Sequence, residues 1–510
     1  MAVEVELKLS VDPEALAALR RHPAIARWAR GPWRTTRIAS TYFDTPAGEL
    51  RSAGVALRVR RIGRRWLQTV KNEGSQLAGL STRSEFEWPL NSPRIDAAKL
   101  SETPWRDLFD ATAGRVKARF VTDIVRRSRP LTSAQGTKTV IALDRGQIRA
   151  GRKRAPIAEI EIEVVEGTPA FAYELARDLV ADFPVAIEHR SKAERGYALL
   201  QRGPPEPVRA RTVDLAHDIS APAAIAAVGA DCLLQIGANA RYVALGIDSE
   251  FLHQLRVGVR RLRSLLKLAE PLTPQDAFAS FDDEMTWLTN TLGPARDWDV
   301  FTTETLPAVS STLHLPPLRR DMGQLKGRAT RMRGVRCAAA KQTADSPRLT
   351  LLLLALGARF AALTVGEPGA AAASSARSFA QGVLDQCARR LKKRAKRLLH
   401  ASPVERHRAR IAAKKLRYAA EFFTPLYSGG RSKAYLAKLA KLQTALGNLN
   451  DMATAQKLAE ELAQRGKVSF AVARASGVVI GWAAGSEARQ VAAAAKAWRK
   501  CAKVKPFWNA

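Results

Sequence analysis

The amino-terminal part of the chain contains a series of short segments in which apolar and polar positions alternate. Residues 3–8 read Val-Glu-Val-Glu-Leu-Lys, so a strand period of two puts Glu4, Glu6 and Lys8 on one face. Similar segments span residues 36–42, 56–61, 66–71, 83–88, 120–126, 139–143 and 158–165. Turn residues such as Gly63, Gly74 and Gly146 separate several of them. This many short strands predict an antiparallel sheet that is closed, or nearly closed, into a barrel.

Charged side chains recur on one face of these predicted strands. They include Arg58, Arg60, Lys71, Arg83, Glu85, Glu87, Glu159, Glu161 and Glu163. A barrel with these charges inside cannot have a dry core, so it must hold water, ions and a charged ligand. Carboxylates would bind a metal ion there, and Arg and Lys would bind phosphate oxygens. In the alternative interpretation every charged face points outward and the barrel is filled by apolar faces, but the repetition across strands makes this the weaker one.

The sequence changes character after Gly203-Pro204-Pro205-Glu206-Pro207, which can continue neither a strand nor a helix. We therefore expect a first domain over 1–202, a linker over 203–214 and a helical domain over 215–505. The helical part repeats itself with a constant offset of 154 residues, from His253 to His407 and from Arg263 to Arg417. Leu292, Gly293 and Asp297 recur at the same offset as Leu446, Gly447 and Asp451. The pattern predicts a duplicated helical bundle.

Basic residues form stripes on the predicted helices of this repeat. His253, Arg256, Arg260 and Arg263 fall within a sector of about 80° on a helix that turns by about 100° per residue. Their counterparts are His407, Arg410, Lys414 and Arg417, and a third stripe holds Arg389, Lys392, Lys393, Lys396 and His400. The stripes contain almost no acids, so like-charge repulsion is uncompensated without an anion. Nucleic acid is one candidate, but few aromatics are present for base stacking and no nucleic-acid-binding module is recognisable.

The composition agrees with a multidomain globular protein that has an anionic partner. The chain has 510 residues, too many for one core, and its formal charge of +34 favours nucleic acid, a membrane surface or another polyanion. Four scattered cysteines are typical of reduced thiols in a cytosolic protein. No signal peptide is evident at the start, and residues 349–365, which include Arg359, read as a buried core helix because they fall short of about 20 apolar residues. We expect a soluble, cytoplasmic protein.

The first part resembles the CYTH, or triphosphate tunnel metalloenzyme, family over roughly residues 1–200. The resemblance is carried by Glu4, Glu6 and Lys8, Tyr-Phe-Asp-Thr at 42–45, Leu-Arg-Val-Arg at 57–60, Lys71, Arg-Ser-Glu-Phe-Glu at 83–87, Asp144, Glu-Ile-Glu at 161–163 and Ser-Lys-Ala-Glu-Arg-Gly-Tyr at 191–197. It implies an eight-stranded tunnel that hydrolyses or rearranges triphosphates with Mg²⁺ or Mn²⁺. The implied metal ligands are Glu4, Glu6, Glu161 and Glu163, with Glu85 and Asp144 as further candidates. Arg58, Arg60, Lys71, Arg126 and Lys192 would clamp the phosphates, and Lys8 would contact substrate or position the attacking water.

The second part resembles the CHAD domain family over about residues 215–505. The motifs are His253 to Arg263 and Leu292 to Val300, with His407 to Tyr418 and Leu442 to Asp451 in the second repeat. The resemblance implies helical bundles that bind inorganic polyphosphate along a basic channel. The candidate contacts are His253, Arg256, Arg260, Arg261, Arg263, Arg389, Lys393, Lys396, His407, Arg410, Lys414, Lys415 and Arg417. Asp297 and Asp451 are expected to hold neighbouring basic side chains.

Together these features predict an inorganic triphosphatase, which splits tripolyphosphate into diphosphate and phosphate, joined to a polyphosphate-binding helical domain. One alternative keeps the enzyme class but changes the substrate to thiamine triphosphate or a nucleotide, with nucleotide cyclisation included. The other is a polyphosphate-binding protein with an idle tunnel. Association with polyphosphate granules would follow from either.

Overall fold

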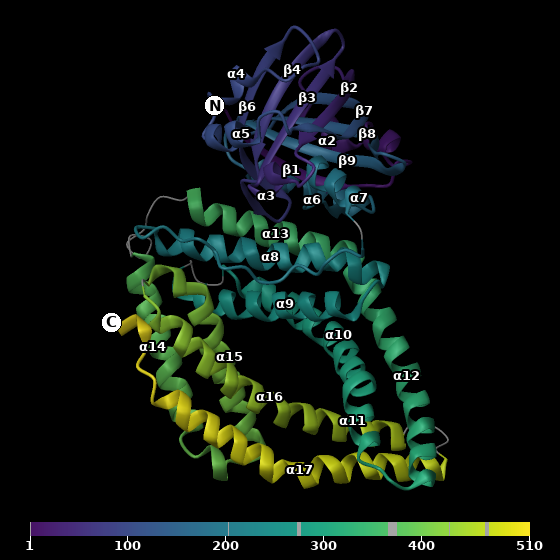
Figure 1. Cartoon of the computed structure of the whole chain (residues 1–510), viewed down its shortest axis with the longest axis vertical. Helices are drawn as coiled ribbons and strands as arrows, with labels where there is room; N and C mark the ends of the chain where they lie inside the picture. The colour runs from purple at the N-terminus through teal and green to yellow at the C-terminus, as the bar shows by residue number, and fades with distance from the viewer. Residues whose placement is uncertain are drawn as a thin grey trace. The chain divides into compact units, whose positions relative to one another are not determined.

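The computed structural model describes residues 2–201, 203–272, 277–365, 375–427, 429–464 and 469–509. They form two compact units. The first comprises Met1–Pro207 together with Ser346–Ala362, and the second comprises Val208–Asp345 together with Leu363–Ala510 (Figure 1).

Eight antiparallel strands of the first unit close into a barrel. In ring order they are β1 (Ala2–Ser10), β9 (Lys153–Glu166), β8 (Lys138–Ala150), β7 (Lys117–Thr132), β2 (Arg34–Asp44), β3 (Val55–Ile62), β4 (Arg65–Asn72) and β6 (Leu80–Leu90), and β6 pairs with β1. The short strands β5 (Ser75–Leu77) and β10 (Ala186–Ile187) extend the sheet. The structure confirms the predicted barrel.

Apolar residues of the strands pack outward beneath helices. Leu7, Leu9, Ile160 and Ile162 are fully buried on β1 and β9, against which α6 (Ala170–Asp182) packs. The other helices of this part are α1 (Leu16–Leu19), α2 (Pro23–Trp28), α3 (Glu49–Ser52), α4 (Ala97–Leu100), α5 (Arg106–Thr112) and α7 (Lys192–Leu200). The outward apolar faces leave the charged faces inside the barrel.

One part of the barrel interior is apolar. Ile38, Tyr42, Phe120, Ile124, Ile148, Ala150, Ile157 and Tyr197 form a buried cluster, in which Tyr197 comes from α7. Ile124 and Arg126 are two residues apart on β7, so the apolar cluster and the charged residues share the inner face. Helix α7 therefore packs on the interior and brings its first residue, Lys192, to the charged part.

The sequence predicts that Gly146 lies in a turn between strands, but in the structure it lies inside β8. A Cβ atom at this position would lie 2.0 Å from the carbonyl oxygen of Asp123 on β7. The close approach of the two strands requires a glycine, which explains a turn residue within a strand.

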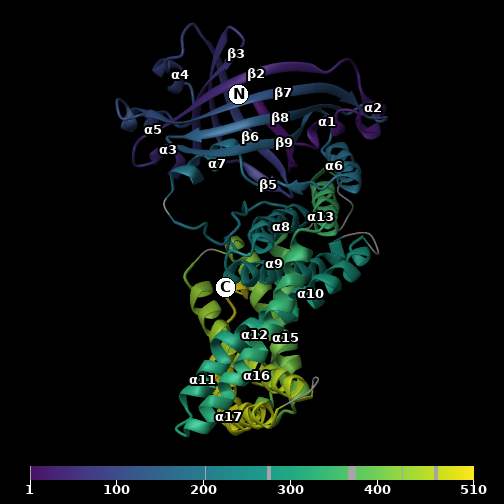
Figure 2. The same cartoon turned by 90° about the vertical axis from the view of Figure 1, so that its right-hand side faces the viewer.

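The second unit contains two structural repeats. The first includes α8 (Ala221–Leu245), α9 (Ser249–Ala269), α10 (Asp282–Val300), α11 (Leu306–Ser311) and α12 (Pro316–Ala344). The second includes α14 (Ala376–Ala395), α15 (Pro403–Phe423), α16 (Arg431–Gln464) and α17 (Phe470–Ala502). Helices α9 and α15 begin and end 154 residues apart, and α12 and α17 begin 154 residues apart. The predicted sequence repeat is thus a repeat of helices, with α8 beside α9 and α16 beside α17 (Figures 1 and 2).

Helix α13 (Pro347–Val365) belongs to neither repeat. A Cβ atom on Gly357 would lie 2.6 Å from Cβ of Ala78 and 2.8 Å from Cε1 of Tyr173. Helix α13 therefore packs tightly on α6 and on the loop after β5, and the stretch Ser346–Ala362, which holds most of α13, belongs to the first unit. This differs from the expected helical domain at 215–505, which included this stretch.

Among the residues that the structure describes, two helices are long and apolar enough to cross a membrane by length and composition, namely α8 and residues 347–364 of α13. Buried residues make up 67% and 44% of their most apolar windows. A core helix of a soluble protein meets the same criteria, so the finding is weak evidence for a membrane span.

Candidate functional site

The strand register gathers charged side chains from distant parts of the first unit. Glu6 lies opposite Glu163, Lys8 opposite Glu161, Arg126 opposite Asp144, Asp144 opposite Glu159, and Lys71 opposite Glu85. All of these residues occupy the inward positions of their strands. The barrel thus brings together the candidate site residues Glu4, Glu6, Lys8, Arg58, Arg60, Lys71, Glu85, Arg126, Asp144, Glu161, Glu163 and Lys192.

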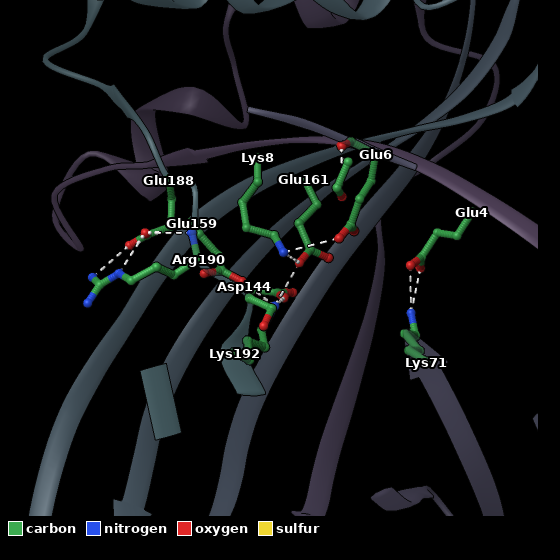
Figure 3. Close-up of polar contacts among 12 residues, drawn as sticks. Glu4, Glu6, Lys8, Lys71, Asp144, Glu159, Glu161, Glu188, Arg190 and Lys192 are labelled. Atoms are coloured by element: carbon green, nitrogen blue, oxygen red, sulfur yellow. Dashed lines mark hydrogen bonds and ion pairs between the residues drawn. The ribbon is translucent and has the colours of Figure 1, made fainter. Parts of the chain in front are cut away.

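Lys192 lies at the centre of a buried acidic group. The Ser191 hydroxyl accepts a hydrogen bond from the Glu194 N–H, and the Glu194 carboxylate accepts one from the Ser191 N–H. This capping box places Lys192 first in α7, where its Nζ lies 2.7 Å from Asp144, 2.8 Å from Glu161 and in contact with Glu159 (Figure 3). Burial would lower the pKa of Lys192, but the three carboxylates raise it well above its usual value. Lys192 is therefore a buried ammonium, not a surface lysine.

Arg126 and Lys8 supply further positive charge beside Glu161. Arg126 donates hydrogen bonds of 2.8 and 2.7 Å to Asp144 and contacts Glu161. The Nζ of Lys8 lies 3.1 Å from Glu6 and 3.4 Å from Glu161. Burial raises the pKa of Glu161, but Lys192, Arg126 and Lys8 outweigh it and hold this pKa well below its usual value. Glu161 is thus an ionised carboxylate whose charge is already balanced.

Glu163 has no such balance. It lies directly opposite Glu6, and within the described part of the chain it forms no hydrogen bond or ion pair. Although Glu163 is exposed, partial desolvation raises its pKa, and Glu4, Glu6 and Glu161 raise it further by like-charge repulsion, whereas Arg126 opposes the shift. Like charges that face each other on paired strands are destabilising, so a cation bound here would stabilise the barrel. Carboxylate oxygens suit Mg²⁺ and Mn²⁺, and Glu4, Glu6, Glu161 and Glu163 are the carboxylates that the family resemblance expects to hold such a cation.

A second carboxylate group is more compact. Asp144, Glu159 and Glu161 are buried, and each offers an oxygen within 4.8 Å of the other two. The triad could hold a metal ion, but its oxygens already surround the Lys192 ammonium. A metal ion in the triad would have to compete with that ammonium. A metal ion at the first set would compete with ammonium groups as well, since Lys71 lies 2.7 Å from Glu4 and Lys8 lies 3.1 Å from Glu6. Glu163 is the member of that set that forms no ion pair with a described residue.

Lys71 and Arg58 pair with acids in another part of the interior. The Nζ of Lys71 lies 2.7 Å from Glu4, a pair drawn apart from the Lys192 group in Figure 3, and 3.1 Å from Glu85. Arg58 reaches Glu85 at 3.4 Å. Burial would raise the pKa of Tyr42, but Arg58, Arg60 and Lys192 lower it. The positive charges of Arg58 and Arg60 therefore act on Tyr42 in this part of the barrel.

Two inner arginines have charge without a counterion. The Nε atoms of Arg60 and Arg83 are buried without a hydrogen-bond partner, and neither side chain forms an ion pair with any residue that the structure describes. Burial and the nearby Arg58 and Arg126 lower the pKa of Arg60 to about 10. An anion in the barrel would satisfy both guanidinium groups.

Sequence reasoning did not include Glu159, Arg195 and Arg83 among the site residues. Glu159 is fully buried, contacts Lys192 and accepts a hydrogen bond of 2.7 Å from Arg195. Alternation places Glu159 on the same face as Glu161, but it does not distinguish the partner of a lysine from a metal ligand. Arg195 follows Lys192 by about one helical turn, and this spacing could have indicated it.

The second unit brings the basic helices of its repeats together. Arg260 of α9 lies close enough to lower the pKa of Arg256 on the same helix and of Arg410 and Lys414 on α15, and we call these four residues the helical basic cluster. The Nε atoms of Arg260 and Arg410 are buried without a hydrogen-bond partner. Burial, then Arg260, Arg410 and Arg256, lower the pKa of Lys414 to about 7. An anion is the missing component of this cluster.

Two carboxylates lie beside the helical basic cluster. Asp297 is 3.4 Å from Arg256, as expected for a residue that holds a basic side chain. Burial raises the pKa of Asp451, although Arg410 opposes the shift. His253 also lies here, and burial followed by Arg296 lowers its pKa.

Other predicted polyphosphate contacts have different surroundings. Arg261 is buried and donates hydrogen bonds of 2.9 Å to both Asp231 and Gln235, so it holds α9 against α8 and is not placed to meet a ligand. Arg417 is engaged with Glu421 at 2.6 Å and with Gln443 at 3.1 Å. The remaining candidates form no ion pair with described residues; Lys415 is partly buried, and the exposed ones are Arg263, Arg389, Lys393, Lys396 and His407.

These features define a two-domain protein with a charged antiparallel tunnel and a duplicated helical unit with a basic cluster. The CYTH domain family matches residues 2–197, and the CHAD domain family matches residues 227–460. The crystal structure of the CHAD domain from the plant Ricinus communis is 34% identical, covers 59% of this chain and 98% of that chain, and has a TM-score of 0.52. The chain therefore belongs to the CHAD family and carries a CYTH domain before its CHAD domain, as the sequence resemblance predicted.

A curated relative matches the tunnel part of the chain. It is an inorganic triphosphatase from Haemophilus influenzae, 29% identical over 201 residues, which make up 39% of this chain and 55% of the relative. The chain thus spans about half the length of this relative.

Proposed function

We propose that the tunnel hydrolyses tripolyphosphate to diphosphate and phosphate with the help of a divalent cation. We further propose that the helical unit binds long-chain inorganic polyphosphate. The observation that carries the first proposal is the coexistence, inside one barrel, of an uncompensated carboxylate at Glu163 and uncompensated arginines at Arg60 and Arg83. A cation together with a polyanion would satisfy both.

The phosphate chain would bind to the guanidinium groups. Arg60 and Arg83 offer donors that no described acid occupies, and Arg58 and Lys71 sit beside Glu85. Arginine forks match phosphate oxygens and would neutralise charge that develops on the leaving diphosphate. These cations are fixed by strands, so little reorganisation would be needed during the reaction.

Glu4, Glu6, Glu161 and Glu163 would hold Mg²⁺ or Mn²⁺. A bound cation of this kind supplies charge neutralisation at phosphate oxygens and favours ionisation of a water molecule. Lys8 lies between Glu6 and Glu161, and although burial lowers its pKa, these carboxylates and Glu159 raise it above the usual value. Lys8 would therefore act as a proton donor in hydrogen bonds that orient the substrate or the attacking water, and not as a base.

Lys192 and Arg126 have a positioning role in this account. They hold Asp144, Glu159 and Glu161 in one network and so fix the carboxylate of Glu161. A rigid Glu161 would preserve the geometry of the cation site. The earlier expectation that Lys192 and Arg126 clamp phosphate stays open as a second role.

Inorganic tripolyphosphate is favoured over thiamine triphosphate or a nucleotide by the aromatic residues of the interior. Tyr42 and Phe120 are stacked on each other, with ring centroids 4.7 Å apart, and both belong to the buried apolar cluster. Neither ring is available for a thiazole or a base. The activity that the name of the Haemophilus influenzae relative states points in the same direction.

A substrate comparison tests this assignment. Initial rates for tripolyphosphate, thiamine triphosphate and ATP should be measured at equal concentration with Mg²⁺ and with Mn²⁺, together with product identification. We expect tripolyphosphate to give the highest kcat/KM, with diphosphate and phosphate as products in equal amounts. A higher kcat/KM for an organic triphosphate, or a cyclic nucleotide product, would replace the proposal by the corresponding alternative.

Polyphosphate binding to the helical unit is supported by the helical basic cluster. Four cations from two repeats face two carboxylates there, and two guanidinium Nε atoms lack partners. A Glu6→Ala variant should lose turnover and keep polyphosphate binding, which would separate the two activities. Competition between polyphosphate and single-stranded nucleic acid is needed as well, because both depend strongly on salt. We expect polyphosphate to displace the nucleic acid; the reverse order would favour a nucleic-acid-binding protein.

A further inference from the structure

The outside of the barrel carries arginines that play no part in the tunnel. Arg37 on β2 and Arg145 on β8 lie in one row across the sheet, with Val125 of β7 between them. Arg149 on β8 and Arg154 on β9 are direct partners, and one outward-facing row, that of Gln147 and Asp123, separates them from the row of Arg145. All four are exposed, and alternation points them away from the inner residues Ile38, Asp144 and Glu159. We call Arg37, Arg145, Arg149 and Arg154 the outer arginine face. Strands β7 and β8, labelled in Figure 2, belong to this part of the barrel wall.

The charge of this face is unbalanced. Asp123 is the carboxylate of the intervening row, yet it forms no ion pair, and none of the four arginines has a hydrogen bond or ion pair to another described residue. Arg149 and Arg154 face each other across paired strands, an arrangement that is destabilising for like charges. Solvent screening reduces this cost but does not reverse its sign. An anion along the arginine rows would reverse it.

The face also has a hollow in which a ligand could lie. A depression of about 520 Å³ is lined by Asp123, Val125, Arg145, Gln147, Arg154 and Pro156, among other residues. The lining includes the apolar residues Val125 and Pro156 and the guanidinium groups of Arg145 and Arg154. Neighbouring strands lie about 4.8 Å apart, so the arginines form a closely spaced array of bidentate phosphate donors. Asp123 would repel an anion placed directly on it, which favours a ligand that follows the arginine rows.

We propose that the outer arginine face binds a stretch of linear polyphosphate on the outside of the barrel. The proposal rests on the proposed function of the chain as a polyphosphate binder, and it adds a site that is separate from both the tunnel and the helical basic cluster. A linear phosphate polymer carries a negative charge at every phosphorus, so one ligand can meet several arginines. The residues that line the hollow include no aromatic side chain. Base stacking would therefore contribute nothing, which favours inorganic polyphosphate over single-stranded nucleic acid.

The test is a charge reversal with a matched control. The variant Arg145→Glu/Arg149→Glu/Arg154→Glu should be compared in the full chain with Arg20→Glu/Arg21→Glu/Arg94→Glu, because these residues are also exposed and the charge change is equal. We expect the first variant to bind long-chain polyphosphate roughly 10-fold more weakly than the control. The slope of log K against log salt should become shallower by about 2. This value assumes three lost phosphate contacts, each worth about 0.7 as in single-stranded nucleic acids. The rate of tripolyphosphate hydrolysis should be the same in both. Equal polyphosphate affinity of the two variants would overturn the proposal.

A second measurement locates the ligand directly. Arginine-specific chemical labelling of the wild type, read by peptide mass spectrometry, should show Arg145, Arg149 and Arg154 protected by long-chain polyphosphate and not by saturating tripolyphosphate. Unchanged labelling, or protection by single-stranded nucleic acid alone, would reject the proposal. If the wild type binds no polyphosphate at all, the proposed function of the helical unit fails as well. If the wild type binds and the arginines stay unprotected, only the outer site is rejected.

Discussion

Glu6 and Glu163 are direct partners across the paired strands β1 and β9, and both carboxylates point into the barrel. Glu6 has Lys8 at 3.1 Å, whereas Glu163 forms no ion pair with a described residue. At the Glu6–Glu163 pair, therefore, one carboxylate has an ion-pair partner and the other has none among the described residues. A binding site for a divalent cation would explain why such a pair is present inside the barrel.

Replacing Glu163 by Gln should stabilise the protein in chelator and weaken its response to metal. Partial desolvation and the neighbouring Glu4, Glu6 and Glu161 raise the pKa of Glu163, so at neutral pH its charge opposes folding. Because Glu163 is exposed, solvent screening reduces this effect, and removing the charge should stabilise the protein by at most about 1 kcal/mol. The upward shift in Tm caused by Mn²⁺ should shrink. Glu174→Gln is the control, because Glu174 is exposed on α6 and forms no ion pair with a described residue. A lower Tm in chelator with an unchanged Mn²⁺ shift would contradict the assignment.

Arg60→Gln and Arg61→Gln provide a matched pair on one strand. Arg60 points inward without a counterion, whereas Arg61 is exposed and donates a hydrogen bond to the carbonyl of Gly63. We expect Arg60→Gln to lower kcat/KM for tripolyphosphate by roughly 10²-fold, because a preorganised donor to the transition state is lost. Arg61→Gln should change it little. Steady-state kinetics decide the matter, and equal effects of the two substitutions would rule out a specific role for Arg60.

The binding of polyphosphate to the helical unit should weaken above neutral pH. The pKa of Lys414 is lowered to about 7 in the free protein, and a bound anion should raise it again. Below pH 7 Lys414 is protonated in both states and affinity is constant; above pH 7 binding takes up one proton, so affinity should fall by up to 10-fold per pH unit. Titrations between pH 6 and about 9 measure this fall. Lys414→Arg should remove most of it, and a pH profile identical to that of the wild type would count against the cluster.

Helix α13 should contribute to the stability of the tunnel unit. A methyl group at Gly357 would clash with Ala78 and Tyr173, whereas Gly382 on α14 has open space around its Cα. Gly357→Ala should therefore lower the unfolding transition that Mn²⁺ and tripolyphosphate shift, by an amount typical of overpacking, roughly 1–3 kcal/mol. Gly382→Ala should be neutral or stabilising, since alanine favours a helix. Calorimetry measures the unfolding transition of both variants. An unchanged transition temperature in Gly357→Ala would mean that the packing of α13 does not depend on this close contact.

The sequence was most informative where a regular spacing of residues indicated which side chains are buried and which segments are equivalent. A strand period of two identified the inner faces of β1, β3, β6 and β9, because both sides of each strand are constrained by packing. The offset of 154 residues identified the equivalent helices α9 and α15. These features allowed the barrel, the helical repeat and most of the inner charges to be predicted.

Other features depend on contacts that a periodic pattern does not encode. The apolar pattern of α13 predicts a buried helix, but it does not reveal that Gly357 packs on Ala78. Arg261 follows Arg260 in a basic stretch, yet its buried partners Asp231 and Gln235 lie on another helix. Glu159 shares a face with Glu161, and only the position of Lys192 distinguishes their surroundings. Partner choice, unlike face, needs the three-dimensional structure.

The most direct test of the account is phosphate release from tripolyphosphate in the presence of Mg²⁺, Mn²⁺ or chelator, for the wild type and for Glu6→Ala. Circular dichroism and retained polyphosphate binding would show that the variant is folded. The account predicts release that requires a divalent cation and that falls by roughly 10²-fold or more in Glu6→Ala. Release that persists in chelator, or a folded wild type that releases no phosphate with either metal, would contradict it and leave a protein that only binds polyphosphate.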